Sequence, residues 1–169
     1  MITNTTGEWE QRCAALWDRF DEFEPAEFRS KMQELSDELP EGHPAACFER
    51  ASACDATDLG EHAVPLYRKA LAGGLEGERR RQAVIQLAST LRALGDPEAS
   101  VELLAEEREN GSDCLDDAVE AFLSLALIDV GRERDAAVVA LRALSRHLPR
   151  YRRSVAAYVE AAAQQPFRG

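Results

Sequence analysis

The side chains that could do acid–base, nucleophilic or metal chemistry are few and scattered in this sequence. The three histidines stand singly, at His43, His62 and His147, and no HExxH, P-loop, GxSxG or GxGxxG pattern occurs. His43 precedes Pro44 and is predicted to cap or flank a helix, whereas His62 is predicted to be solvated. His147 is expected in the last turn of a helix, where a cation offsets the helix dipole. We therefore predict no catalytic residue and no enzymatic activity.

The cysteines and the acidic residues also lack the spacing of a metal site. The four cysteines, at positions 13, 47, 54 and 114, form no CxxC motif. Cys47 and Cys54 share a predicted helix face, but a zinc ion would need two more ligands, so we interpret them as buried thiols in a reducing cytoplasm. Asp55, Asp58 and Glu61 are too sparse for a calcium loop. The sequence predicts no bound metal and no cofactor.

Three consecutive arginines, Arg79, Arg80 and Arg81, begin a predicted helix. Positive charge at a helix N-terminus is unfavourable to the dipole, so helix stability does not explain these residues. We predict an exposed charged turn, and a contact for an acidic partner is the alternative.

The charge of the chain argues against several classes of partner. Its 169 residues carry a net charge of −11, and binding to nucleic acid needs a basic face. Residues 1–78 hold 17 acids and 7 bases, whereas residues 132–169 hold 3 acids and 8 arginines, which predicts two solvated faces of opposite sign or a docking role. No apolar run approaches the roughly 18 residues of a membrane span, and the first six residues do not resemble a signal peptide. We expect a cytoplasmic monomer or homodimer that binds neither nucleic acid nor membrane.

Apolar residues recur at helical spacing along the whole chain, and no strand-like alternation appears, which predicts an all-α fold. Helices are expected over residues 8–22 and 25–40. The segment 40–44, Pro-Glu-Gly-His-Pro, is the clearest break, so residues 1–43 are predicted to be an N-terminal helical extension or cap.

From residue 44 the pattern repeats. Gly60, Gly95 and Gly131 each separate two apolar helical segments, at intervals of 35 and 36 residues, which is typical of a solenoid of helix pairs. Residues 44–149 are predicted to form these repeats, and residues 150–169 a C-terminal capping helix and tail. Pro65, inside one expected helix, should strain or kink it.

The residues of these pairs resemble a known family. In the third pair, Leu123, Ser124, Leu127, Gly131 and Ala136 look like a tetratricopeptide repeat, because small residues let paired helices approach closely and larger ones fill the gaps. The run from residue 48 to residue 71 is similar to a bacterial group of small proteins within that family. The resemblance implies a right-handed α-α superhelix of about three helix pairs.

The resemblance also implies a concave groove that binds a peptide or an amphipathic helix of a protein partner. By the register of the repeats, the groove residues are Phe48, Ser52, Asp55, Gln82, Ile85, Ser89, Arg92, Leu125 and Asp129. Some family members hold a terminal carboxylate with Lys and Asn at such positions, and those residues are absent here. We expect a protein-interaction module. The alternative is a structural or self-associating protein whose groove is filled by its own N-terminal helices or by a second copy.

Overall fold

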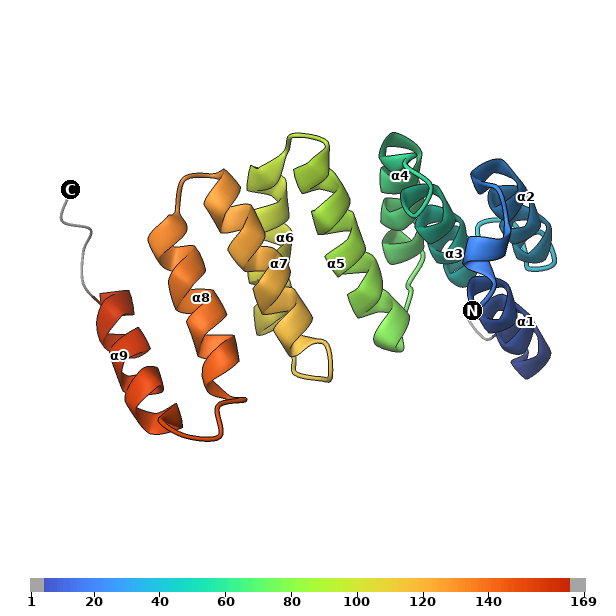
Figure 1. The fold of residues 1–169 in the computed structure, drawn as a ribbon. Helices are drawn as coiled ribbons and strands as arrows, with labels where there is room; N and C mark the ends of the chain where they lie inside the picture. Colours follow the sequence, from blue (N-terminus) through green and yellow to red (C-terminus); the bar gives the residue numbers. More distant parts are fainter. Residues whose placement is uncertain (1–4, 165–169) are drawn as a thin grey trace. The chain divides into compact units, whose positions relative to one another are not determined.

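A computed structural model of the chain describes residues 5–164 (Figure 1). Within these residues the backbone forms nine α-helices and one short 3-10 helix, with no strand. The helices are α1 (Gly7–Trp17), η1 (Phe20–Glu22), α2 (Pro25–Ser36), α3 (Pro44–Asp55), α4 (Gly60–Ala72), α5 (Gly77–Ala93), α6 (Pro97–Glu109), α7 (Asp116–Asp129), α8 (Glu133–Ser145) and α9 (Arg152–Gln164). The predicted all-α fold is confirmed.

The chain divides into two compact units, Met1–Thr90 and Leu91–Gly169. The division falls inside α5. The sequence predicts one compact domain with segment boundaries at 43/44 and 149/150, and this stays a prediction.

Capping and proline residues next in the sequence determine where α1 and α2 begin, and both helices end earlier than predicted. The Thr6 hydroxyl caps α1 by accepting a hydrogen bond from the Trp9 backbone N–H at 3.2 Å, and Pro25 occupies the first turn of α2. Where the sequence predicts one helix over residues 8–22, the α-helix ends at Trp17 and a separate 3-10 helix, η1, follows at Phe20–Glu22. This tighter turn brings the Phe20 ring edge-on against Phe28, with 4.7 Å between ring centroids. The predicted helix 25–40 likewise ends at Ser36.

The core of the N-terminal unit joins α1, α2 and α3. Its buried members are Trp9, Cys13, Phe28, Met32, Leu35, Ala45 and Ala53. The Trp9 indole N–H donates to the Leu35 carbonyl at 2.8 Å, so the polar edge of this buried ring is satisfied. The small residues Ala45 and Ala53 let α3 approach closely. The N-terminal extension is therefore packed onto the first repeat helix and is not a loose tail.

The pair α3 and α4 shows why an imperfect repeat still folds. Thr57, at a position where apolar residues are usual, is buried and donates its hydroxyl to the Ala53 carbonyl at 2.7 Å. Pro65 lies inside α4, yet the helix continues to Ala72. Pro65 is exposed, so water can reach the backbone carbonyl that its missing N–H leaves without a partner.

In the C-terminal unit, α7 and α8 form the main pair. Gly131, between them, has φ +73, a left-handed conformation that favours glycine and explains its place in the repeat. In α9, Val159 is 4% exposed and the neighbouring Tyr158 is 75% exposed, because successive helical residues point about 100° apart and α9 packs through one face. Tyr151, which precedes the helix, is 77% exposed.

We predict that replacing Phe28 with alanine will destabilise the N-terminal unit by about 3–5 kcal/mol, because the Phe28 ring is fully buried and its removal leaves a cavity. The midpoint of urea unfolding, followed by circular dichroism, measures this. Tyr158→Ala removes an exposed aromatic ring and should leave the midpoint nearly unchanged. Equal midpoints for both variants would contradict the packing described for α1, α2 and α3.

Candidate functional site

Arg79, in the first turns of α5, links three helices of the N-terminal unit. Its two terminal nitrogens donate to the two carboxylate oxygens of Glu10 on α1, at 2.7 and 2.6 Å. Its Nε donates to Glu49 Oε1 on α3 at 2.9 Å, and its guanidinium lies over the Trp9 ring, 5.6 Å from the centroid. Charge-assisted, bidentate hydrogen bonds of this kind are stronger than hydrogen bonds between neutral groups.

The prediction of an exposed charged turn at residues 79–81 is therefore wrong. The Arg79 side chain is 26% exposed and Arg81 is only 6% exposed. For Arg79 the reason is that carboxylates distant in the sequence neutralise it and an aromatic ring covers it, so its position near the start of a helix does not place it in water.

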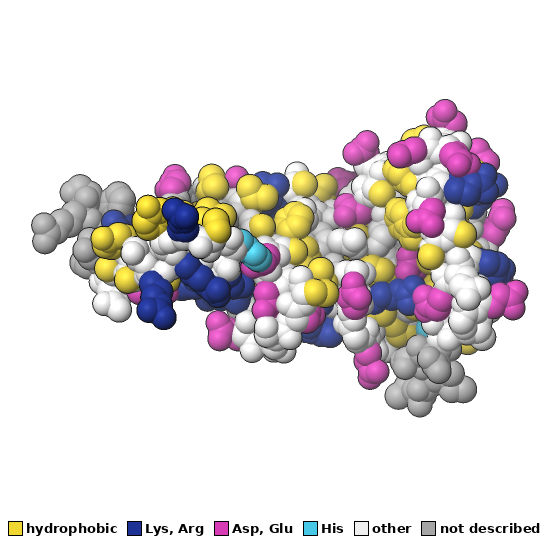
Figure 2. All heavy atoms as spheres, turned by 60° about the horizontal axis from the view of Figure 1, so that its bottom comes forward, with side chains coloured by type: hydrophobic (Ala, Val, Ile, Leu, Met, Phe, Trp, Pro, Cys, Tyr) yellow, Lys and Arg dark blue, Asp and Glu magenta, His cyan; other side chains and the backbone are white. Residues whose placement is uncertain are grey.

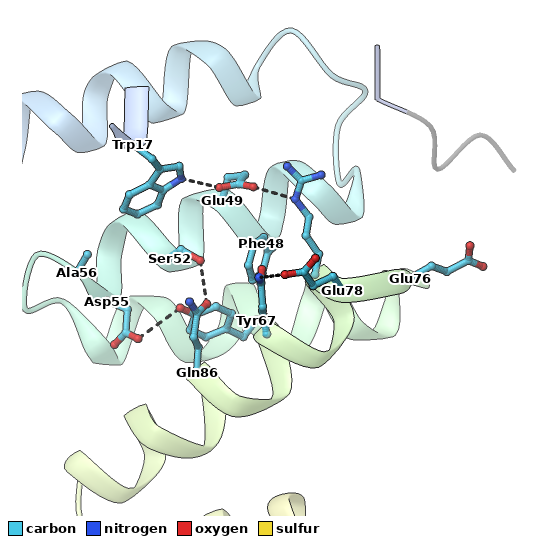
Figure 3. Close-up of a pocket in the computed structure, with 12 residues that line it drawn as sticks. Trp17, Phe48, Glu49, Ser52, Asp55, Ala56, Tyr67, Glu76, Glu78 and Gln86 are labelled. Carbon is cyan, nitrogen blue, oxygen red and sulfur yellow. Dashed lines mark hydrogen bonds and ion pairs between the residues drawn. The ribbon is translucent and has the colours of Figure 1, made fainter. Parts of the chain in front are cut away.

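Glu49 is the buried counterpart of Arg79. While one carboxylate oxygen accepts from Arg79, the other accepts from the Trp17 indole N–H at 2.8 Å (Figure 3). Both oxygens are thus satisfied, as a buried carboxylate requires. We call Glu10, Glu49, Arg79 and Trp17 the hub.

The hub shifts the titration of its members. The hydrogen bonds from Arg79 hold the pKa of Glu10 below its usual range, and the hydrogen bonds to Glu10 raise the pKa of Arg79. Burial, with the charge of Glu49 next in effect, raises the pKa of the Cys13 thiol. Cys13 is therefore a protonated core residue and not a reactive thiolate.

Beside the hub lies a cleft of about 880 Å³ in the N-terminal unit. It is lined by Trp17, Phe48, Glu49, Ser52, Asp55, Ala56, Tyr67, Glu76, Glu78, Arg79, Gln82 and Gln86. Phe48 and Tyr67 supply buried aromatic rings, with 6.3 Å between their centroids. The N-terminal extension contributes Trp17 to the wall of this cleft and does not fill it (Figure 3).

Hydrogen bonds between α3 and α5 shape the polar side of the cleft. Ser52 Oγ donates to Gln86 Oε1 at 3.0 Å, and Thr90 Oγ1 donates to Asp55 Oδ1 at 2.9 Å. The other Asp55 oxygen accepts from the Tyr67 hydroxyl at 3.3 Å. Burial raises the pKa of Asp55, and the two hydroxyl donors oppose that rise. Burial also raises the pKa of Tyr67, which stays a neutral donor.

The structure brings together only some of the predicted groove residues. Phe48, Ser52, Asp55 and Gln82 line the cleft. Ile85 is buried and Ser89 half-buried on α5, and neither lines it. The other three belong to the C-terminal unit, and their predicted role stays a prediction; they are Arg92, Leu125 and Asp129. There Arg92 Nη1 donates to Asp129 Oδ2 at 2.7 Å, and Leu125 is exposed.

Several residues of the site were missed by the sequence analysis, notably Glu49, Arg79 and Gln86. One signal points to them. Glu49 directly follows the small and apolar run of residues 44–48 at the start of α3. Arg79 and Gln86 are seven residues apart and so lie on one face of α5. An acid in a buried stretch requires a cation or several donors from another helix.

A family model described as Tetratrico peptide repeat matches residues 44–162 of the chain. The chain belongs to the tetratricopeptide repeat family. The match begins at α3 and ends within α9, so α1 and α2 lie outside it. No curated protein and no solved structure matches the chain significantly. Tetratricopeptide repeat proteins are generally scaffolds for protein partners and not enzymes.

Two of the three histidines of this tetratricopeptide repeat protein have structural partners. His43 caps α3 by accepting from the Ala45 N–H at 3.2 Å, His62 is exposed, and His147 Nε2 lies 2.7 Å from Asp117 Oδ2. Within residues 5–164, no three His, Cys, Asp or Glu side chains are grouped so that they could hold a metal ion. None of the helices in that range is long and apolar enough to cross a membrane.

We predict that Arg79→Met will lower the free energy of unfolding by about 3 kcal/mol at pH 7, because it leaves the buried Glu49 and the half-buried Glu10 without a cation. The pKa of Glu10 is lower in the folded protein than its ordinary value of 4.5. Its contribution is therefore complete above pH 4.5 and is lost as the pH falls through the lower, folded value. The difference between wild type and variant should shrink accordingly in urea titrations at decreasing pH.

Arg12→Met is the matched control for this experiment. Arg12 pairs with Glu38 on the surface, where both side chains are close to half exposed, so its loss should change stability little. A hub that does not stabilise the fold would make the two variants indistinguishable.

Proposed function

We propose that the chain is a protein-interaction module whose N-terminal cleft binds a short, extended peptide segment of a protein partner. The observation that carries this proposal is the cleft itself, because it combines buried aromatic rings with a row of amide and hydroxyl groups. Binding sites are typically concave and apolar with a few placed polar groups. The scaffold role of the family supports the same class of function.

The amides of α5 suit the backbone of a peptide. Gln82 Nε2 donates to Glu78 Oε1 at 3.1 Å, so the Gln82 side-chain oxygen is available as an acceptor, and Gln86 Oε1 accepts from Ser52, so the Gln86 amide N–H groups are available as donors. Residues four apart on a helix are about 6 Å apart along its axis. Alternate residues of an extended peptide are separated by about 6.7 Å. Each of the two amides can therefore meet a different residue of the peptide, with Gln82 accepting from a backbone N–H and Gln86 donating to a backbone C=O.

The cleft is also organised before any ligand arrives. The hub holds α1, α3 and α5 together, and the hydrogen bonds of Ser52 and Asp55 fix the side chains between α3 and α5. A preformed site loses less conformational entropy on binding, so modest contacts suffice for affinity.

A self-associating protein is the second candidate, and one observation favours it. Within the described residues, the large apolar side chains that are well exposed all lie in the C-terminal unit; they are Leu94, Leu125, Ile128, Leu141, Leu144, Tyr151 and Tyr158. Figure 2 shows hydrophobic side chains, with arginines among them, over α8 and α9. Exposed apolar surface of this kind marks contacts with other molecules. Light scattering separates the candidates, since a mass that doubles with concentration favours self-association and a constant monomer mass favours the first proposal.

We predict that a displayed library of random short peptides will yield sequences that bind the full chain saturably and change the fluorescence of Trp17 in the cleft wall. Gln82→Trp places a bulky ring over the cleft from a half-buried position and should weaken these peptides about tenfold or more.

Arg68→Trp is the matched control, because Arg68 is exposed on α4 and does not line the cleft. It should leave binding unchanged. Peptides that bind both variants as tightly as the wild type would place the binding site elsewhere and overturn the proposed function.

A further inference from the structure

We propose that the cleft selects peptides that carry a lysine or arginine, and that Asp55 is the residue that receives the cationic side chain. This inference rests on the proposed function, because it names the chemistry of the peptide that the same cleft would take.

The charges lining the cleft are not balanced. Four carboxylates line it, from Glu49, Asp55, Glu76 and Glu78, and one cation, Arg79. Arg79 is fully engaged in the hub, where it bonds Glu10 and Glu49. The cleft is therefore negative, and it repels a peptide carboxylate.

Of the lining carboxylates that have no cation bonded to them among the described residues, Asp55 is the half-buried one, whereas Glu76 and Glu78 are exposed to solvent. The two oxygens of Asp55 accept from the hydroxyls of Thr90 and Tyr67, and no cation is bonded to it within residues 5–164. It is half-buried, and the rise of its pKa with burial shows that hydroxyl donors compensate its desolvation only in part. Each carboxylate oxygen can accept a second hydrogen bond, so both hydroxyl donors can stay in place when a cation binds.

The surroundings of Asp55 suit a long basic side chain. The half-buried Trp17 and the exposed Ala56 line the same cleft and offer an apolar surface, behind which the Phe48 and Tyr67 rings are buried (Figure 3). The methylene stem of a lysine or arginine packs on such a surface while its charged end reaches a carboxylate. A charge pair at a half-buried carboxylate is screened less by water and salt than one on the open surface, so one such residue can dominate the choice of peptide. Glu78, exposed at the start of α5, adds to the negative potential at the rim.

The cleft differs in charge from the grooves of those family members that bind a terminal carboxylate. Where some tetratricopeptide repeats place lysine and asparagine to hold a terminal carboxylate, this chain has Phe48, Ile85, Ser52 and Ser89. The lining of the cleft therefore carries negative charge, where a site for a carboxylate carries positive charge.

The test uses the full chain and the peptides selected from the random library. We expect the selected pool to be enriched in lysine and arginine relative to the starting library. In one selected peptide, each basic residue is then replaced by norleucine, which keeps the stem and removes the charge. One of these replacements should weaken binding to the wild type about tenfold or more. The same replacement should have little effect on Asp55→Asn, so that the two changes are coupled in a double-mutant cycle.

Glu61→Gln is the control for long-range charge. It removes the same charge from an exposed position on α4 that does not line the cleft, and it should show no coupling to the peptide. If Asp55→Asn fails to fold by circular dichroism, the norleucine series on the wild type still decides.

The outcomes separate the two proposals. Selected peptides that lack basic residues, or norleucine replacements that cost nothing, overturn the cation preference and leave the cleft as the peptide site. A library that yields only peptides insensitive to Gln82→Trp overturns the cleft itself.

Discussion

Burial of the Glu49 carboxylate is the constraint on which the N-terminal unit depends. An ionised carboxylate taken out of water costs several kcal/mol unless charged and polar partners surround it. Here the partners are Arg79 of α5 and the indole of Trp17 at the end of α1. Apolar contacts between helices are non-directional and tolerate sliding, whereas these hydrogen bonds have one geometry. The hub therefore sets the register in which α1, α3 and α5 meet.

The hub also decides how the extension relates to the cleft. Residues 1–43 lie outside the family match, yet Trp17 forms part of the cleft wall and Glu10 binds the arginine that starts α5. Two outcomes were open, since the N-terminal helices could fill the groove or leave it alone. In the N-terminal unit, the described part of the extension packs its apolar face on α3 through Trp9 and places Trp17 in the cleft wall, where its indole N–H donates to Glu49. The site is then a property of the repeats and the extension together.

Sequence reasoning succeeded where the governing interactions are local. The proline and glycine breaks, the cap at His43 and the glycine at Gly131 are read from neighbours within a few residues, and the structure has each of them. It failed at Arg79, whose partners Glu10 and Glu49 are 69 and 30 residues away. Of the residues that the repeat register assigns to the groove, Asp55 lines the cleft, whereas Ile85 is buried and does not line it. The periodicity of apolar residues predicts which face of a helix packs against the protein. How deeply each residue of that face is buried depends on side chains from other helices, and the sequence alone does not identify those.

The ion pairs and the cleft explain part of the uneven charge along the chain. Many arginines of the C-terminal segment are used internally, as Arg142 is with Glu160 and Arg146 with Asp117. Residues 1–78 have an excess of acids, and four of these acids line the cleft, namely Glu49, Asp55, Glu76 and Glu78. Beyond about 8 Å, physiological salt screens such a field, so it can speed the approach of a basic peptide without distinguishing one from another. Discrimination has to arise at contact, where Asp55 is held by two hydroxyls and lacks a counterion among the described residues. The field and the contact thus act on different quantities, the first on the rate of association and the second on the lifetime of the complex.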